Sequence, residues 1–371
     1  MKTFNTAGTC RPSEHYMVDI TERLEIIKKM VAKGDYFCIN KGRQYGKTTT
    51  LDAVYDVLSN DYCVFKISFE GLSDKIFADV NTALAAFLKL MKQEAVWTNK
   101  EKNILCLLQN VAPRELAVYD EIDFVDVVAE LCTISSKPIV VLIDEVDQAG
   151  NNEGFVKFLG ILRSMYLRRN TPPTFLSVIL AGVYDIKNLK LKLRSSEQHQ
   201  YNSPWNIAAP FDIDMSLPER GIADMLAEYK SDHNLSFDET SIAKMIREYT
   251  SGYPFLVSRI CQIIETERLS WDESSVLRAV NIILIERNTL FDNMIKKLDE
   301  YPKLKQTLKE ILFSGKKKTF SPDEKYIQIA EMSGYIVNKE GCIAVSCRIM
   351  ETRLYNLFIN ENGENLMMTQ G

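Results

Sequence analysis

The sequence predicts an α/β protein with a five-stranded, doubly wound parallel sheet, followed by a region made of helices. Three observations predict it. Short apolar runs alternate with segments of helical periodicity through the first 216 residues. A basic, hydroxyl-rich segment that ends in Gly46-Lys47-Thr48 follows the first run, and two acids, Asp144 and Glu145, end the third. Parallel strands need crossover connections, and the helical segments between the runs supply them.

The elements follow from periodicity and from the residues that bound each run. The expected strands are 36–39, 63–68, 139–143, 176–181 and 211–215. The expected helices among them are 19–34, 48–58, 76–93, 99–110, 124–135 and 155–169.

Composition indicates a globular protein with more than one domain. The chain has 371 residues, of which 46% are hydrophobic and 26% charged, so it can bury a substantial core. The composition turns to helix without strand after Pro218. We therefore expect an α/β core over 1–216, a helical lid over 217–290 and a winged helix with a short tail over 291–371.

Several classes of protein are disfavoured. No apolar run approaches the ~20 residues that span a bilayer, and the N-terminus lacks an apolar signal segment, so we expect a cytoplasmic protein without a membrane partner. The eight cysteines are scattered and the three histidines lie far apart, which argues against a zinc site. The net charge of −5 argues against nucleic-acid binding by the whole surface.

Gly46-Lys47-Thr48 is the ending of a phosphate-binding loop, in the strand-loop-helix setting that such a loop requires. Backbone N–H groups would cradle phosphate oxygens, Lys47 would reach the β- and γ-phosphates, and the Thr48 hydroxyl would bind Mg²⁺. The full pattern has glycine where Lys41 stands, with Gly42 one position late. The alternative is an ordinary turn with an exposed lysine. The expected nucleotide contacts are Gly42, Arg43, Gln44, Tyr45, Gly46, Lys47, Thr48 and Thr49.

The acids after the third strand complete this interpretation. Asp144 can hold Mg²⁺ through water, and Glu145 can orient and activate the attacking water. A buried strand with two solvated acids at its tip is the alternative. No guanine-reading Asn-Lys-x-Asp is evident, so ATP is favoured over GTP.

Further candidates lie around this site. Asp185, past the fourth strand, is a candidate sensor, although aspartate there can equally cap a turn. Tyr16 can pack on an adenine ring, or the segment around it can be a surface arm. The expected order of loop, acids and sensor along the strands is that of an additional-strand, catalytic-glutamate P-loop NTPase.

The helical region offers a second group of candidates. In Thr250-Ser251-Gly252-Tyr253-Pro254, Pro254 can lie against adenine and couple the lid to the nucleotide, or the segment can be a plain helix break. Arg259, one turn further, can serve as a lid sensor. Hydrolysis also calls for a cation at the transferring phosphoryl group, which a neighbouring subunit could supply through Arg163, Arg168 or Arg169.

Helices followed by the strands 335–337 and 342–345 and a last helix at 348–359 predict a winged helix. Lys316, Lys317 and Lys318 add a cationic loop, which can contact DNA or simply face solvent around a packing domain. The cationic run 187–194 has the same two interpretations.

With these residues identified, the sequence resembles bacterial AAA-like ATPases of the STAND or archaeal-ATPase type. The resemblance runs from about residue 8 to 359, and it rests on the Arg-Gln-Tyr-Gly-Lys-Thr loop and on segments 178–190, 203–207, 250–258 and 348–356. It implies an ATPase with ATP and Mg²⁺ as cofactors. Relatives often continue into a restriction-nuclease-like domain, and none is expected in this chain, so no nuclease activity carries over.

Two functions remain open at this stage. One is an ATP-hydrolysing molecular switch whose lid and winged helix respond to nucleotide. The other is a nucleotide-gated binding module with little hydrolysis that docks DNA or a protein through the winged helix. The sequence leaves open whether the chain forms a homo-oligomer.

Overall fold

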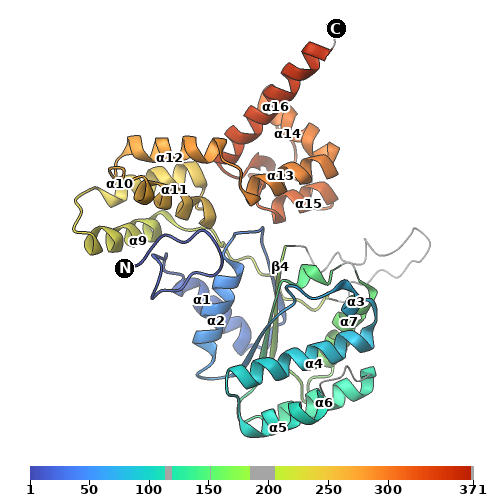
Figure 1. The fold of residues 1–371 in the computed structure, drawn as a ribbon. Coiled ribbons are helices and arrows are strands. Elements are labelled where there is room, and N and C mark those ends of the chain that lie inside the picture. The colour runs from blue at the N-terminus through green and yellow to red at the C-terminus, as the bar shows by residue number, and fades with distance from the viewer. Residues whose placement is uncertain (113–118, 151, 184–204, 369–371) are drawn as a thin grey trace. The chain divides into compact units, whose positions relative to one another are not determined.

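A computed structural model describes residues 1–112, 119–150, 152–183 and 205–368 (Figure 1). The chain forms two compact units. Unit 1 comprises Met1–Asp19, Lys41–Gly46 and Asp214–Gly371, and unit 2 comprises Ile20–Asn40 and Lys47–Ile213. The phosphate-loop segment 41–46 thus groups with the C-terminal half of the chain rather than with the strand and helix that it joins.

Unit 2 is built on a parallel sheet whose four described strands are ordered β1-β4-β3-β2. The strands are β1 (Phe37–Asn40), β2 (Cys63–Ser68), β3 (Ile139–Asp144) and β4 (Ser177–Gly182). All three strand pairs are parallel. β4 lies between β1 and β3, which is the inserted strand of the additional-strand order. The carboxyl ends of β1 and β3 therefore point to the same edge of the sheet.

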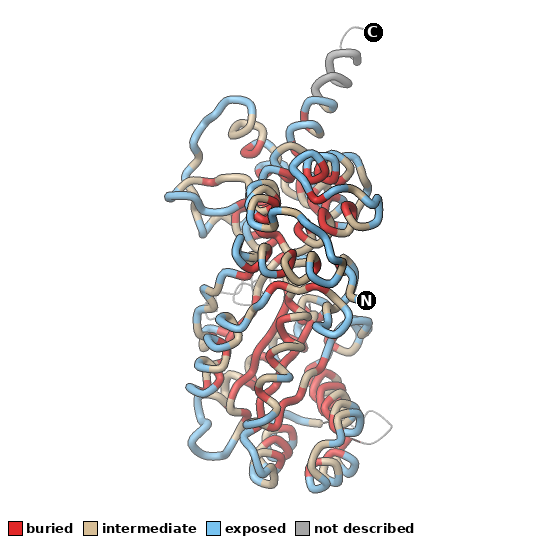
Figure 2. The backbone as a smooth tube through the Cα atoms, turned by 90° about the vertical axis from the view of Figure 1, so that its left-hand side faces the viewer, coloured by how far each residue is buried: buried red, intermediate tan, exposed pale blue. Residues whose placement is uncertain are grey.

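Helices cover both faces of this sheet. In Figure 1, α1 and α2 lie on one side and α4 to α7 on the other. Every residue of β3 and β4 is buried, as expected of central parallel strands (Figure 2). The helices are α1 (Thr21–Ala32), α2 (Lys47–Leu58), α3 (Asp74–Ala78), α4 (Val80–Trp97), α5 (Lys102–Val111), α6 (Glu121–Ile134), the 3₁₀ helix η1 (Val146–Gln148) and α7 (Glu153–Leu167).

The predicted fifth strand at 211–215 is not part of the described sheet. The chain touches β1 through a single bridge, between Ala209 and Phe37. Phe211 instead stacks its ring on Phe37, with centroids 5.7 Å apart. Among the described residues no hydrogen-bonded ladder forms over 211–215, so the apolar residues of this segment do not make a strand.

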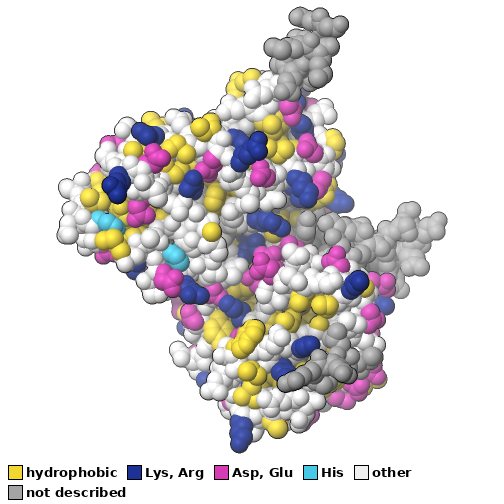
Figure 3. Space-filling view, in the orientation of Figure 1, with side chains coloured by type: hydrophobic (Ala, Val, Ile, Leu, Met, Phe, Trp, Pro, Cys, Tyr) yellow, Lys and Arg dark blue, Asp and Glu magenta, His cyan; other side chains and the backbone are white. Residues whose placement is uncertain are grey.

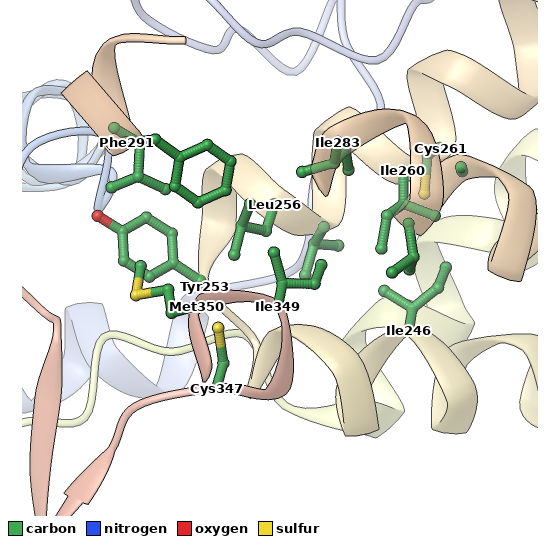
Figure 4. Packing of buried hydrophobic residues seen from close by; sticks show 14 of the residues in the cluster. Ile246, Tyr253, Leu256, Ile260, Cys261, Ile283, Phe291, Cys347, Ile349 and Met350 are labelled. Atoms are coloured by element: carbon green, nitrogen blue, oxygen red, sulfur yellow. The ribbon is translucent and has the colours of Figure 1, made fainter. Parts of the chain in front are cut away.

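Unit 1 is mainly helical. Its elements are α9 (Glu219–Asp232), α10 (Glu239–Thr250), α11 (Pro254–Thr266), α12 (Glu273–Ile285), α13 (Thr289–Glu300), α14 (Pro302–Ser314), α15 (Lys325–Met332), the hairpin β5 (Ile336–Lys339) and β6 (Cys342–Val345), and α16 (Arg348–Met368). Its core joins residues from α9 to α16, part of which Figure 4 shows. The N-terminal residues Phe4 and Tyr16 pack into the same core.

Two expected helices are divided in the structure. The expected helix at 76–93 forms α3 and α4, with Asp79 at the junction accepting from the Thr82 N–H at 2.9 Å. The sequence also predicts one helix over 289–314, which in the structure breaks before Pro302, the first residue of α14. Both breaks follow local chemistry, since aspartate favours helix starts and proline cannot continue a helix.

The domain boundaries at 216/217 and 290/291 stay predictions.

Acidic and basic side chains are interspersed on the face drawn in Figure 3. Within the described residues, no helix is both long and apolar enough to cross a bilayer.

Candidate functional site

The loop after β1 ends in a left-handed backbone, and α2 begins directly after it. Gly46 has φ of +76°, where glycine is favoured because it lacks a Cβ, and Gln44 has φ of +58°. α2 starts at Lys47, so the first N–H groups of the helix have no partner within it. Lys47 is only 6% exposed, which excludes the interpretation of this turn as one with an exposed lysine.

The start of α2 and the end of β3 are joined by a hydrogen bond. The hydroxyl of Thr48, in the first turn of α2, donates to the Asp144 carboxylate at 2.7 Å. Asp144 is the last residue of β3 and is 6% exposed. The other oxygen of that carboxylate accepts from the Glu145 N–H at 2.9 Å. Burial and fixed partners hold this carboxylate in place, so it is not a solvated acid at the tip of a strand.

Glu145 occupies a strained position next to this pair. It has φ of +52° and ψ of +40°, a conformation that costs an L-residue about 1 to 2 kcal/mol. Such outliers persist where the surrounding structure enforces them, and they cluster at functional sites. The left-handed turn sends the chain into η1 immediately after Glu145.

Asp147 ties that turn to β4. Its carboxylate accepts from the Val183 N–H at 3.0 Å. A Cβ added to Gly182 would lie 2.9 Å from the same carboxylate oxygen, so glycine permits the close approach. The sequence analysis did not identify Asp147. The only sequence feature that could have indicated Asp147 is its position as a third acid, two residues after Glu145.

The phosphate-loop segment 41–46 makes its own contacts within unit 1. The hydroxyl of Tyr253 donates to the Arg43 carbonyl oxygen at 2.6 Å. The Tyr45 and Tyr253 rings meet edge to face, with centroids 4.6 Å apart. A Cβ on Gly42 would lie 2.5 Å from the Ser333 carbonyl oxygen, so this position needs glycine for close packing. This close packing explains why glycine stands at position 42, one position late in the motif.

The residues of unit 2 fit a nucleotide with Mg²⁺. Thr48 and Asp144 bring a hydroxyl and a carboxylate within hydrogen-bonding distance, and these oxygens are the ligand types that Mg²⁺ prefers. Lys47 supplies a buried cation in the same helical turn. The first turn of α2 supplies backbone N–H groups to an anion.

The candidate arginines lie at the other end of the sheet. Arg169 donates to the carbonyl oxygen of Gly34, which precedes β1, at 2.9 Å. Arg168 donates to Ser164 at 3.0 Å, and Arg163 donates to Asn206 at 2.7 Å. α7 runs from the carboxyl edge of the sheet back to the amino edge, so its last residues are remote from Asp144 within unit 2. Their predicted role requires a neighbouring subunit and stays a prediction.

The candidates in unit 1 have structural partners. Tyr16 is 2% exposed, its ring lies 5.1 Å from that of Phe4, and its hydroxyl donates to Asp232 at 3.0 Å. Pro254 is the first residue of α11. Arg259 pairs with Glu286 at 2.7 Å.

Adenine contacts by Tyr16 and Pro254 and phosphate sensing by Arg259 stay predictions. Asp185 and the cationic run 187–194 lie outside the described residues.

Comparisons with known proteins agree with a phosphate-loop site on a parallel sheet. The model of the AAA-like domain family matches residues 8–360. A Walker-type ATPase of Pyrococcus abyssi has a similar fold, with a TM-score of 0.64 and 14% identity over 95% of this chain and 99% of that chain. The ORC2 protein of Aeropyrum pernix, in ADPNP-ADP complexes, has a TM-score of 0.48 and 12% identity over 94% of this chain and 93% of that chain. No curated protein sequence matches the chain.

The family match covers nearly the whole chain and includes the loop, the acids after β3 and the helical half. The first structural likeness supports the fold of the parallel sheet. The chain therefore belongs to the AAA-like domain family and is an AAA-like P-loop ATPase.

Proposed function

We propose that the chain binds ATP with Mg²⁺ at the start of α2 and hydrolyses it as a molecular switch. The observation that carries the proposal is the 2.7 Å hydrogen bond between Thr48 and Asp144. It brings together the two parts of a P-loop site, which the sequence supplies 96 residues apart. A plain strand-to-helix turn has no need of a buried lysine, a hydroxyl and a buried carboxylate in one place.

Each residue has a distinct role. Lys47 would hold the β- and γ-phosphates, and the Thr48 hydroxyl and the Asp144 carboxylate would hold Mg²⁺, the latter through water. The backbone from Gly42 to Thr49 binds phosphate oxygens through its N–H groups. Glu145 accepts a proton from the attacking water and orients it. Bound Mg²⁺ would neutralise charge on the transferring phosphoryl group.

The switch itself involves the C-terminal half of the chain. We assign residues 217–290 to a lid and 291–371 to a winged helix, in the manner of STAND-type ATPases. The order of elements supports the second assignment, because the helices α14 and α15 precede the β5–β6 hairpin, as helices precede the wing of a winged helix. The lid would change its angle when the γ-phosphate leaves. Pro254 and Arg259 remain the candidate lid contacts, Asp185 the candidate sensor, and Arg168 the candidate finger of a homo-oligomer.

The direct test measures thermal unfolding with ATP, ADP and GTP, each with and without Mg²⁺, followed by phosphate release. We expect ATP and ADP to raise the unfolding temperature, and Mg²⁺ to increase the effect. Equal unfolding temperatures with and without every nucleotide would refute binding.

Hydrolysis is tested separately with Glu145→Gln, which keeps the size of the side chain and removes the base. We expect this variant to bind ATP as the wild type does and to lose phosphate release by about 10²-fold or more. Unchanged release in the variant would end the claim for Glu145.

A second candidate function is a nucleotide-gated module that docks duplex DNA. It is favoured by Lys316 and Lys317, which are exposed after α14, next to Lys318, whose ammonium pairs with Glu310 at 2.6 Å. Exposed cations beside a helix-and-hairpin element can contact phosphates. In this version the output is docking, and hydrolysis is slow.

Duplex binding as a function of salt tests the second candidate. Each phosphate contact contributes about 0.9 to the slope of log affinity against log salt concentration. Lys316→Ala combined with Lys317→Ala should lower the slope by up to about 2, whereas Lys33→Ala with Lys244→Ala, two exposed lysines elsewhere, should not. Absence of binding by micromolar protein at low salt would reject this function.

A further inference from the structure

Tyr253 is held in a turn that has little freedom. α10 ends at Thr250, and both Ser251 and Gly252 have left-handed backbones, with φ of +49° and +72°. The Gly252 N–H donates to the Thr250 hydroxyl oxygen at 3.0 Å. A Cβ on Gly252 would lie 2.3 Å from the Leu217 carbonyl oxygen. Pro254 then begins α11, so Tyr253 is fixed between two constrained residues.

The Tyr253 side chain spans from the core of unit 1 to the phosphate loop. Its ring is 2% exposed and lies beside Phe291 and Met350 in Figure 4, with the hydroxyl at the edge of the group. That hydroxyl donates to the Arg43 carbonyl oxygen. Burial raises the pKa of Tyr253 well above its ordinary value, so the hydroxyl keeps its proton and remains a donor.

A second element contacts the loop beside Tyr253. This is the turn between α15 and β5, residues 333–335, which we call the α15–β5 turn. Gly334 has φ of +76°, and a Cβ there would lie 3.1 Å from the Tyr253 ring and 3.3 Å from the Tyr45 ring. Ser333 packs against Gly42 through its carbonyl group. The loop is thus contacted at Gly42, Arg43 and Tyr45 by residues from two parts of unit 1 that are far apart in the sequence.

The position of the Arg43 carbonyl matters for phosphate binding. The peptide bond that joins Arg43 to Gln44 is planar, so its carbonyl and its N–H point in opposite directions. A donor that fixes the carbonyl oxygen of Arg43 therefore fixes the direction of the Gln44 N–H. In a phosphate loop, this N–H is one of the groups that must converge on the phosphates.

We propose that Tyr253 is a positioning residue for the phosphate loop and that the α15–β5 turn is the second support of the same loop. Nucleotide binding and the packing of the C-terminal helices are then coupled through Tyr45 and Tyr253. The effect of Tyr253 on nucleotide binding rests on the proposed function. Its support of the loop needs no bound nucleotide.

The test uses the full chain with Tyr253→Phe, which removes the hydroxyl and keeps the ring. The matched control is Tyr36→Phe. The Tyr36 side chain is also buried, and its hydroxyl also donates to a backbone carbonyl, that of Phe175 at 2.9 Å, before the amino ends of β1 and β4. Both variants lose one hydrogen bond from a tyrosine hydroxyl to a backbone carbonyl.

Two measurements keep the inference separate from the proposed function. Amide hydrogen exchange without nucleotide should be faster at residues 42–46 in Tyr253→Phe than in the wild type or Tyr36→Phe. The dissociation constant for ADP should rise about 5- to 10-fold in Tyr253→Phe, with no comparable change in Tyr36→Phe. Equal loop exchange in the two variants would overturn the positioning role. Faster loop exchange in a chain that binds no nucleotide would uphold it and reject the function instead.

Gly334→Ala tests the second support. The added methyl presses on both tyrosine rings, and Gly341→Ala, at φ of +78° with nothing within 4 Å of the added Cβ, is its control. We expect Gly334→Ala to speed exchange at residues 42–46 and to weaken ADP binding more than Gly341→Ala does. Identical exchange and affinity in the two alanine variants would remove the α15–β5 turn from the proposal.

Discussion

The Thr48 hydroxyl donates to the Asp144 carboxylate at 2.7 Å and so connects the first turn of α2 to the end of β3. Strand order explains how this contact arises. β4 lies between β1 and β3, and all the described strands of the sheet are parallel. Groups that follow β1 and groups that end β3 therefore lie at one edge, where doubly wound proteins bind their ligands.

The first prediction concerns the dependence of nucleotide binding on the metal. Mg²⁺ should tighten ATP binding about 10- to 100-fold less in Thr48→Ala and in Asp144→Asn than in the wild type, because each substitution weakens one group that would hold the metal directly or through water. Removing the metal from the wild type with a chelator should reproduce this loss. Thr48→Ser keeps the hydroxyl and should retain the tightening. Calorimetric titration with and without Mg²⁺ measures it, and full tightening in both variants would assign the metal elsewhere.

The second prediction concerns the turn that holds Tyr253. Gly252→Ala should lower the free energy of unfolding by at least about 3 kcal/mol, because it combines a left-handed backbone with a collision at the Leu217 carbonyl. Gly315→Ala, at φ of +60° in open space, should cost only about 1 to 2 kcal/mol. Urea denaturation compares the two. Equal losses would show that the backbone at Gly252 moves away without cost.

The third prediction concerns pH and Glu94 on α4. Burial raises the pKa of Glu94 above its ordinary value, so the folded state favours the protonated form. This carboxyl therefore contributes most to stability at low pH, and its contribution falls as pH rises from about 4.3, its unfolded value, through the raised folded pKa.

Glu94→Gln should consequently stabilise the protein at pH 7 and have little effect near pH 4, because glutamine resembles the protonated acid and can still accept from the Lys66 N–H. Glu130→Gln, on the exposed face of α6, is the control. Denaturation at the two pH values measures the difference, and a loss of stability at pH 7 would contradict the sign.

The parallel strands could be predicted because buried strands leave a strong local signal. The segment 63–68 is predicted and observed with the same bounds, and the other three observed strands are displaced by at most one residue. β3 is apolar along its length and ends in an acid, so its role could be inferred without knowing its neighbours. The prediction of a fifth strand was wrong because an apolar residue that packs singly, as Phe211 does on Phe37, leaves the same local signal as one in a strand.

The contacts of the loop could not be predicted, because they depend on residues that are distant in the chain. Tyr253 and Arg43 are 210 residues apart, and nothing local distinguishes a tyrosine between Gly252 and Pro254 from one in an ordinary break between helices. The sequence singled out the motif at 250–254 for a contact between Pro254 and adenine, which stays a prediction. In the described structure, it is Tyr253 that contacts the loop.

The most direct test of the central claim is thermal unfolding of the wild type and of Lys47→Ala with increasing ATP and Mg²⁺. A ligand at 100 times its dissociation constant stabilises the folded state by about 2.7 kcal/mol. We predict that the wild type is stabilised in this way, that Lys75→Ala, an exposed lysine variant on α3, behaves like it, and that Lys47→Ala gains nothing. Stabilisation of Lys47→Ala equal to that of the wild type would contradict a nucleotide site at the start of α2.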